Sequence, residues 1–361
     1  MATISERRAD RSVHVNGDGR GQDDAHEAGS SQKGNPRPDC QSGGRFGGQG
    51  AHSRRIDRAR GVPAKAVFGL EPGGQNWKNG GMKPLLTLAL AVATLPLAAA
   101  EQTRDIEYAR VQGTALHLDA AVPDGDGPFP IAILIHGGGW SAGDKRGEGD
   151  IKPLMEPLTR AGFVWFSIDY RLAPSNHWPA CIEDVQSAIR WVKTHANEFK
   201  GDRNRTALVG YSAGGHLACL AAVLADDTTR VQAVVGCAAP TDHIADSERR
   251  GGLSKSMQAV LNSPAEFGPE SRQLLRNLSP INYVKPGLPP FLLLGGTEDK
   301  SVPYSQSVNF QARLRAAGVE AQLITLTNAQ HRIGDWHKFD PEYQTQLCGW
   351  LKAKLGAAPH P

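Results

Sequence analysis

Ser212 lies at the centre of the motif Gly210-Tyr211-Ser212-Ala213-Gly214, between an expected strand and an expected helix. A G-x-S-x-G motif in this context is typical of a tight turn that holds a serine in a strained conformation with its hydroxyl exposed. The flanking glycines leave the hydroxyl unobstructed, and the start of a helix favours negative charge nearby. We therefore predict that Ser212 is a nucleophile rather than part of a simple glycine-rich turn. Tyr211 is expected to border the pocket.

A serine hydroxyl is a weak nucleophile at neutral pH, so it needs an imidazole to accept its proton and a carboxylate to orient that imidazole. Hydrolases with such a turn carry these residues in the order serine, acid, histidine. Asp299 and His331 each follow a late apolar run, so both are expected in loops at one edge of a sheet. We predict Asp299 as the acid and His331 as the base. Glu298 and His337 are the competing candidates, and His216 is interpreted as structural.

The stretch His136-Gly137-Gly138-Gly139-Trp140 follows an earlier apolar run. Acyl transfer needs backbone N–H donors aimed at the oxygen that becomes negative in the tetrahedral intermediate, and glycines let the main chain approach that oxygen closely. We predict that Gly138, Gly139 and Ala213 supply these donors in an oxyanion hole. Trp140 is an alternative donor or a wall of the pocket.

Neither a cofactor nor a metal is expected. The stretch after the glycines approaches a phosphate-binding loop, but no glycine immediately precedes Lys145, and Arg146 stands where Ser or Thr would follow. No Cys-x-x-Cys or cysteine–histidine spacing suggests a metal site. Export would permit disulfides, but buried free thiols are the preferred interpretation of the later cysteines, which are Cys181, Cys219, Cys237 and Cys348.

The elements that must position these residues alternate between strands and helices, which predicts an α/β fold with a mostly parallel central sheet and helices on both faces. A polar stretch of about forty residues after 236 is expected to be irregular, and its residues 241–279 to form a small lid over Ser212. Helices are expected at about 150–161, 180–199, 213–224 and 303–317, and near the end of the chain. Strands are expected at 105–111, 115–122, 131–135, 163–168, 206–209, 231–236, 291–294 and 321–326.

Residues from about 105 to 355 resemble the α/β-hydrolase carboxylesterases, especially the bacterial carbohydrate and feruloyl esterases of the BD-FAE type. The matching segments are 136–140, 143–145, 169–174, Pro179, Asp184, 210–215 and the D-x-x-V-P of 299–303. The resemblance implies the α/β-hydrolase fold and a serine triad. Asp169, Arg171 and Asp184 are interpreted as scaffold residues. One departure is Gly295-Gly296, where relatives commonly place His-Gly.

Composition divides the chain into three parts. Residues 1–81 are rich in Gly, Arg, Asp, Asn and Ser, and we interpret them as disordered and as an upstream extension outside the native protein. Residues 82–100 combine Met82-Lys83, an apolar run and three alanines, which predicts a signal peptide and a secreted or periplasmic protein. Residues 101–361 form the expected catalytic domain. The net charge of +3 arises in residues 1–81, so the rest indicates no nucleic-acid or membrane-surface partner.

The predicted function is hydrolysis of short-chain or aromatic carboxylic esters through an acyl-enzyme, with acetyl or feruloyl esters of plant carbohydrate as candidate substrates. The alternatives are an amide or formamide hydrolase or a peptidase on the same fold, or a binding protein with an inactive site. The expected partner is a small-molecule or carbohydrate ester, with no integral membrane segment. The sequence gives no indication of oligomeric state.

Overall fold

Eight strands form one sheet in residues 101–356, the part of the chain that the computed structural model describes. The predicted disordered segment 1–81 and signal peptide 82–100 lie outside the described residues. The strands are β1 (Glu101–Val111), β2 (Thr114–Val122), β3 (Phe129–Ile135), β4 (Val164–Ile168), β5 (Gly201–Tyr211), β6 (Ala233–Cys237), β7 (Phe291–Gly296) and β8 (Ala321–Leu326).

The strand order across the sheet is β1-β2-β4-β3-β5-β6-β7-β8. The first two strands form an antiparallel hairpin, and β2 also pairs antiparallel with β4. All other pairs, from β4 to β8, are parallel, which confirms the predicted fold class. Because parallel strands share one direction, the loops that follow β3, β5, β7 and β8 all leave from the same edge of the sheet, where α/β proteins bind ligands.

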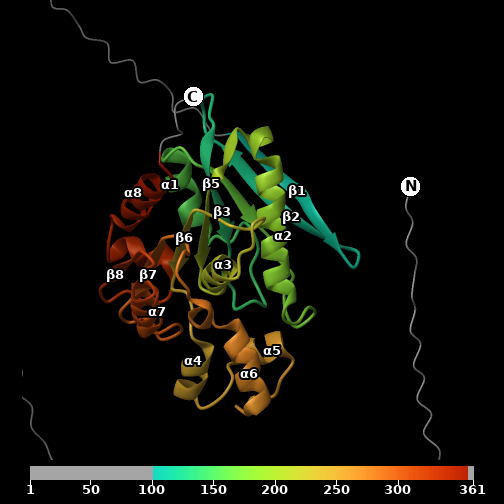
Figure 1. Cartoon of the computed structure of the whole chain (residues 1–361), viewed down its shortest axis with the longest axis vertical. Coiled ribbons are helices and arrows are strands. Elements are labelled where there is room, and N and C mark those ends of the chain that lie inside the picture. The colour runs from blue at the N-terminus through green and yellow to red at the C-terminus, as the bar shows by residue number, and fades with distance from the viewer. Residues whose placement is uncertain (1–100, 357–361) are drawn as a thin grey trace, which may run out of the picture. The chain divides into compact units, whose positions relative to one another are not determined.

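Helices cover both faces of this sheet (Figure 1). The α-helices are α1 (Lys152–Arg160), α2 (Ala180–His195), α3 (Ala213–Val223), α4 (His243–Arg250), α5 (Lys255–Leu261), α6 (Pro269–Leu278), α7 (Ser305–Ala316) and α8 (Tyr343–Leu355). Buried residues of α2, α3 and α7 belong to one hydrophobic cluster, and those of α1 and α8 belong to a second cluster. The two clusters therefore lie on opposite faces of the sheet.

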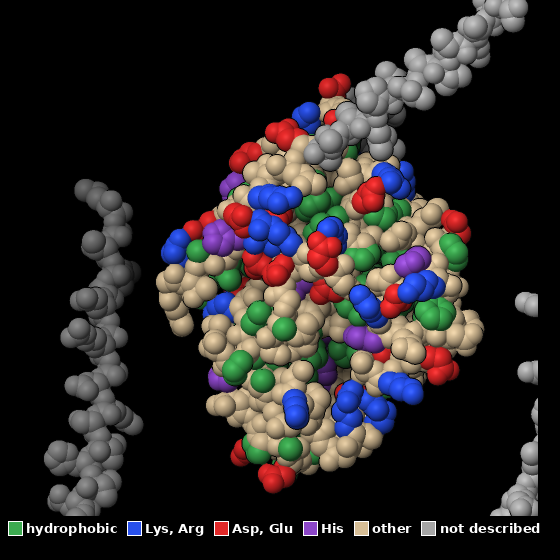
Figure 2. All heavy atoms as spheres, turned by 180° about the vertical axis from the view of Figure 1, so that it is seen from behind, with side chains coloured by type: hydrophobic (Ala, Val, Ile, Leu, Met, Phe, Trp, Pro, Cys, Tyr) green, Lys and Arg blue, Asp and Glu red, His purple; other side chains and the backbone are tan. Residues whose placement is uncertain are grey.

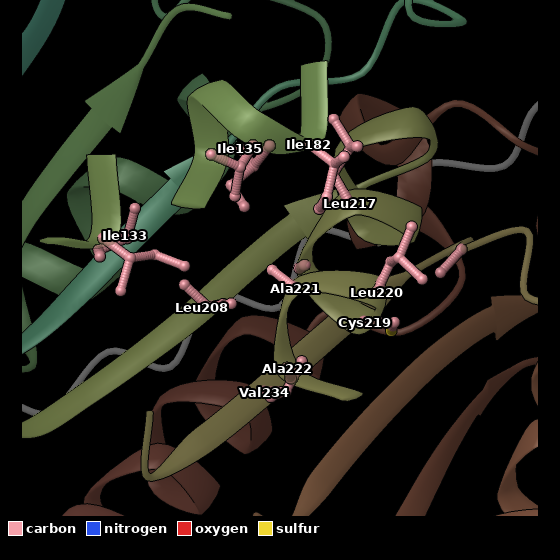
Figure 3. Packing of buried hydrophobic residues seen from close by; sticks show 14 of the residues in the cluster. Ile133, Ile135, Ile182, Leu208, Leu217, Cys219, Leu220, Ala221, Ala222 and Val234 are labelled. Atoms are coloured by element: carbon pink, nitrogen blue, oxygen red, sulfur yellow. The ribbon is translucent and has the colours of Figure 1, made fainter. Parts of the chain in front are cut away.

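The apolar run of β3 shows why this strand needs helices on both sides. Ile131, Ile133 and Ile135 belong to the first cluster, whereas Ala132 and Leu134 belong to the second. Side chains alternate between the two faces of a strand, so a strand covered on both faces is apolar throughout. Figure 3 shows Ile133 and Ile135 near the buried side chains of α3.

The predicted irregular structure between β6 and β7 is wrong, because this segment contains α4, α5 and α6. Each helix has at most ten residues, too short for a clear apolar period. Capping side chains instead determine where α4 and α5 begin. The side chain of Asp242 accepts a hydrogen bond from Ala245 N, and that of Ser254 accepts one from Met257 N. Residues with positive φ then end these two helices, Gly251 at 73° and Asn262 at 49°.

Candidate active site

Ser212 occupies the single residue between the end of β5 and the start of α3. Its φ of 53° and ψ of −118° lie outside the regions that residues with a side chain normally adopt. Its backbone N–H donates to the carbonyl of Cys237 over 2.8 Å, which holds the turn against β6. The sharp turn raises the hydroxyl above the end of the sheet, as the sequence motif predicts.

Glycines are required on both sides of this turn because the main chain packs against itself there. A Cβ atom at Gly210 would lie 2.1 Å from the carbonyl oxygen of Gly214. A Cβ atom at Gly214 would lie 2.0 Å from the carbonyl oxygen of Ile135. The second contact joins the start of α3 to the end of β3, so Gly214 lets the nucleophile turn approach the His136–Trp140 loop.

The structure brings Ser212, His331 and Asp299 into one hydrogen-bonded chain. The Nε2 atom of His331 lies 2.9 Å from Ser212 Oγ, and its Nδ1 atom lies 2.7 Å from Asp299 Oδ2. A carboxylate can only accept a hydrogen bond, so Nδ1 carries the proton and Nε2 presents its lone pair to the serine hydroxyl. In this arrangement the imidazole can take the proton of Ser212 as the hydroxyl oxygen attacks.

The carboxylate of Asp299 is fixed by its own loop. Its Oδ1 atom accepts from the backbone N–H groups of Ser301 and Val302, each over 2.9 Å, which leaves Oδ2 for His331. The Asp299 side chain is 1 % exposed, whereas that of His331 is 26 % exposed toward the cavity. A buried, fully hydrogen-bonded carboxylate holds the imidazole in one orientation.

The competing candidates for the acid and the base take no part in the hydrogen bonds that join Ser212, His331 and Asp299. Glu298 and His337 are exposed, and neither side chain makes a hydrogen bond to another described residue. His216 is completely buried on α3, with Trp140 Nε1 donating to its Nδ1 over 3.1 Å and its Nε2 lying 2.7 Å from the carbonyl oxygen of Leu278. Burial lowers the pKa of His216 to about 4, so the ring is neutral at pH 7.

The predicted oxyanion donors lie beside Ser212. Gly138 and Gly139 have φ angles of 97° and 61°, and both border the cavity that contains the serine. Neither of their N–H groups donates to an acceptor in residues 101–356. Ala213 is the first residue of α3, where the N–H has no partner within the helix. These three N–H groups are thus free to bind an oxygen atom in the cavity. Trp140 lines the same cavity, and its indole N–H donates to His216.

The loop that carries these glycines is held by Asp150, which the sequence motifs did not single out, and by Tyr170 of the matching segment 169–174. Asp150 Oδ2 accepts from Gly137 N over 2.9 Å, and Tyr170 donates its hydroxyl hydrogen to the carbonyl of His136 over 3.0 Å. Lys145 Nζ lies 2.7 Å from Asp169 Oδ2 and is almost fully buried. The only signal for Asp150 in the sequence is its short distance from the glycine run, and this is too common a feature to predict the contact.

Tyr211 has a second function besides lining the cavity. Its hydroxyl group donates to the backbone carbonyl of His331 over 2.6 Å, and burial raises the pKa of this hydroxyl above its ordinary value. The residue before the nucleophile therefore holds the loop of the base. Arg171 and Asp184, interpreted as scaffold, form a buried bidentate pair, and neither residue lines the cavity that contains Ser212.

A cavity of about 510 Å³ opens over the serine. Its remaining walls come from α4, α5 and the Asp299 loop. One link joins two of these walls: Arg250 of α4 bonds Asp246 through Nε and the carbonyl of Ser301 through Nη2, each over 2.8 Å. The lining residues from α4, α5 and their flanks are Pro240, His243, Asp246, Ser247, Arg250, Ser254, Ser256 and Met257.

Residues 101–356 contain no group of three or more His, Cys, Asp and Glu side chains placed to hold a metal ion. The four cysteines there are buried free thiols, as expected, and burial raises the pKa of Cys219 to about 12. No helix in the described range is long and apolar enough to span a membrane. Acidic and basic side chains are interspersed on the face shown in Figure 2.

Comparison with known proteins gives relatives among esterases. The chain is 37% identical over 227 residues to the probable carboxylic ester hydrolase LipM of Mycobacterium tuberculosis, a match that covers 58% of this chain and 51% of LipM. The chain thus spans about half the length of the curated relatives it matches.

Solved structures with the same fold include a truncated carbohydrate esterase from gut microbiota, at 24% identity and a TM-score of 0.61, covering 71% of this chain and 96% of that one. An acetyl ester-xyloside bifunctional hydrolase from Caldicellulosiruptor lactoaceticus is 25% identical, with a TM-score of 0.59, and the match covers 69% of this chain and 95% of that one.

The BD-FAE family model matches residues 118–314, just over half of the chain. The matched segment includes the nucleophile turn and the Asp299 loop and ends before His331. The resemblance that the sequence motifs indicate is thereby confirmed, and the chain belongs to the BD-FAE family.

Proposed function

We propose that the protein is a serine carboxylesterase that hydrolyses short-chain or aromatic carboxylic esters. One observation carries the proposal: Ser212, His331 and Asp299 form a continuous hydrogen-bonded chain at a cavity that also presents three backbone N–H groups with no acceptor among the described residues. These are the groups that acyl transfer from an ester requires. The esterase names of the relatives support the same activity.

In the proposed reaction, Ser212 Oγ attacks the ester carbonyl while His331 Nε2 accepts the serine proton. The N–H groups of Gly138 or Gly139 and of Ala213 stabilise the negative oxygen of the tetrahedral intermediate. Collapse of the intermediate breaks the bond to the alcohol, which leaves with the proton from His331. Water then attacks the acyl-enzyme by the same route and releases the acid. Asp299 stabilises the imidazolium form of His331 in both halves of the reaction.

The cavity and the relatives' names support the proposed substrate class. A cavity of about 510 Å³ lies in the range of small-molecule sites. Its walls combine Trp140, Met257 and Pro240 with the polar side chains of Ser256 and Gln306. A mixed wall suits a short or aromatic acyl group on a polar alcohol better than a long lipid chain. Acetyl or feruloyl esters of plant carbohydrate are our candidate substrates.

The test is the Ser212→Ala variant assayed with p-nitrophenyl acyl esters, acetylated xylan and methyl ferulate. Loss of the nucleophile should reduce kcat on the order of 10⁶-fold with the fold intact. The wild-type protein should also give a burst of p-nitrophenol that matches the enzyme concentration when deacylation is the slower step. A folded Ser212→Ala protein that kept a tenth of the wild-type activity would disprove the assignment. Hydrolysis of formamides or peptides in preference to esters would favour an amidase.

We also propose that the protein is exported by the signal peptide predicted at residues 82–100. The support is the order of Met82-Lys83, an apolar run and Ala98-Ala99-Ala100 in the sequence. Expression from Met82 in a bacterial host should yield esterase activity in the exported fraction and a mature N-terminus at Glu101. Retention of the uncleaved chain in the cytoplasm would contradict this proposal.

A further inference from the structure

His243 is the first residue of α4, and it lines the cavity that contains Ser212. The residue is only 3 % exposed. Its ring packs edge-on against two other rings, with centroid distances of 5.5 Å to Trp140 and 4.7 Å to His216. Trp140 belongs to the loop of the predicted oxyanion donors. His243 thus lies between the helices α4, α5 and α6, which we call the cover, and the part of the cavity where the ester carbonyl would bind.

Neither ring nitrogen of His243 has a hydrogen-bond partner within residues 101–356, and Nε2 is fully enclosed. The neighbouring His216, equally buried, has both nitrogens bonded. A buried polar group without a partner costs stability, and most such groups are explained by water or by a ligand. Burial and the nearby His216 hold the pKa of His243 well below its ordinary value, so the ring has one N–H and one lone pair.

The two nitrogens differ in access. Nε2 is enclosed, whereas Nδ1 is not among the enclosed atoms; because His243 lines the cavity, Nδ1 is the nitrogen left to bond a molecule there. A buried N–H without an acceptor is rarer than a buried acceptor without a donor. We therefore assign the lone pair to Nε2 and the hydrogen to Nδ1. The cavity wall then presents a hydrogen-bond donor that no group within residues 101–356 satisfies.

We propose that His243 is a specificity residue whose Nδ1–H donates to an uncharged oxygen of the bound substrate, a hydroxyl or ether oxygen beyond the scissile ester. The inference rests on the proposed esterase function and adds a group that distinguishes oxygen-bearing esters from alkyl esters. An uncharged oxygen fits because a charge at a site this buried would lose its hydration. A site built to bond such an oxygen disfavours the analogue that lacks it, since the donor is then left unpaired.

The experiment compares two pairs of esters of matched length. On the acyl side the pair is p-nitrophenyl methoxyacetate and p-nitrophenyl butyrate, and on the alcohol side it is 2-methoxyethyl acetate and butyl acetate. Within each pair an ether oxygen replaces one methylene group. His243→Phe keeps a ring but removes both nitrogens. It should lower kcat/KM about tenfold for the oxygen-bearing ester of one pair and much less for its alkyl partner.

The pair that responds tells whether the oxygen belongs to the acid or to the alcohol. His243→Asn places an amide N–H near the position of Nδ1 and should restore part of the preference. Ratios of variant to wild type cancel the different intrinsic reactivities of the esters. If Phe is not accommodated, the smaller His243→Leu is measured with the same esters and is expected to show the same loss.

Thermal unfolding gives the structural control. His243→Phe should melt no lower than the wild type because it removes an unsatisfied polar group, whereas His216→Phe should melt lower because it breaks two hydrogen bonds. Equal effects on both members of each pair would overturn the proposal, as would no effect on either pair, the result expected if His243 bonds only water. A wild-type protein inactive on all four esters would refute the esterase function itself, which Ser212→Ala tests separately.

Discussion

Two regions border the same cavity, but different interactions hold them. The loops after β5, β7 and β8 carry Ser212, Asp299 and His331 from three parallel strands of one sheet, of which β7 is buried throughout and β8 forms the edge. The helices α4, α5 and α6 belong to no sheet and are short, and caps at Asp242 and Ser254 start two of them. The three groups that must keep fixed distances therefore lie on loops of the sheet, whereas α4 and α5 line the cavity from outside the sheet, and side-chain contacts join α4 to the Asp299 loop and α6 to α3.

The largest effect is expected on kcat, in a test that compares two adjacent residues of the Asp299 loop. Asp299→Asn replaces an obligate acceptor with an amide that can stabilise the wrong tautomer of His331, so kcat should fall by up to about 10⁴-fold. Glu298→Gln alters only an exposed neighbour, whose field at His331 is screened by solvent, and should cost less than about tenfold. Steady-state kinetics on a p-nitrophenyl ester measure both, after circular dichroism has verified the fold. A crippled Glu298→Gln enzyme with an active Asp299→Asn enzyme would contradict the observed geometry.

A glycine in each region provides the second test. Gly214→Ala should lower the free energy of unfolding by about 3 kcal/mol or more, because the new Cβ would meet the carbonyl oxygen of Ile135 at 2.0 Å. Gly268→Ala, at the N-cap of α6, adds a Cβ with no atom within 4 Å and should cost about 1 kcal/mol or less, since only a favourable N-cap residue is lost. Urea denaturation of both variants checks the contrast. Comparable losses would mean that the cover is packed as tightly as the nucleophile turn.

The third test uses pH, because His216 joins the two regions through Trp140 and Leu278. Its pKa is lowered to about 4 in the folded protein, against about 6.5 when unfolded. The unfolded chain then binds a proton more readily, so stability from this group is complete above pH 6.5 and is lost as pH falls toward 4. Between pH 7 and pH 5 the loss should be about 2 kcal/mol.

Urea denaturation at both pH values measures this loss. His216→Gln keeps a side-chain N–H donor but does not titrate, so its stability should change less between pH 7 and pH 5. An equal change in the wild type and the variant would assign the effect to other groups. His243, whose pKa is lowered in the same direction, would be the first of these to examine.

The sequence was informative where one short motif determines one local structure. The nucleophile turn could be predicted because only glycine fits at positions 210 and 214 on either side of Ser212. The order of Asp299 and His331 follows from the order of the parallel strands that precede them. The apolar runs of β3 and β7 are unambiguous because both faces of those strands are buried. Asp299 could be preferred to the adjacent Glu298 because its spacing to Val302 and Pro303 fits the D-x-x-V-P segment.

Long-range contacts were not predictable in this way. The bonds from Asp150 to Gly137 and from Tyr211 to the carbonyl of His331 join residues whose types are compatible with many other roles. The short helices between β6 and β7 have only a few buried residues each, and capping side chains begin two of them. Apolar periodicity therefore did not predict these helices. The unpaired imidazole of His243 becomes visible only when every hydrogen bond around it is known.

The contact of Arg250 with the Asp299 loop has a mechanical consequence. The carbonyl of Ser301 accepts from Arg250, and the N–H of the same residue donates to Asp299 Oδ1. Ser301 therefore lies in series between α4 and the carboxylate that orients His331, so a displacement of α4 away from the cavity must either break the Arg250 bond or pull on the residue that holds Asp299. Access to the cavity and alignment of the triad are in this way linked through the backbone of a single residue.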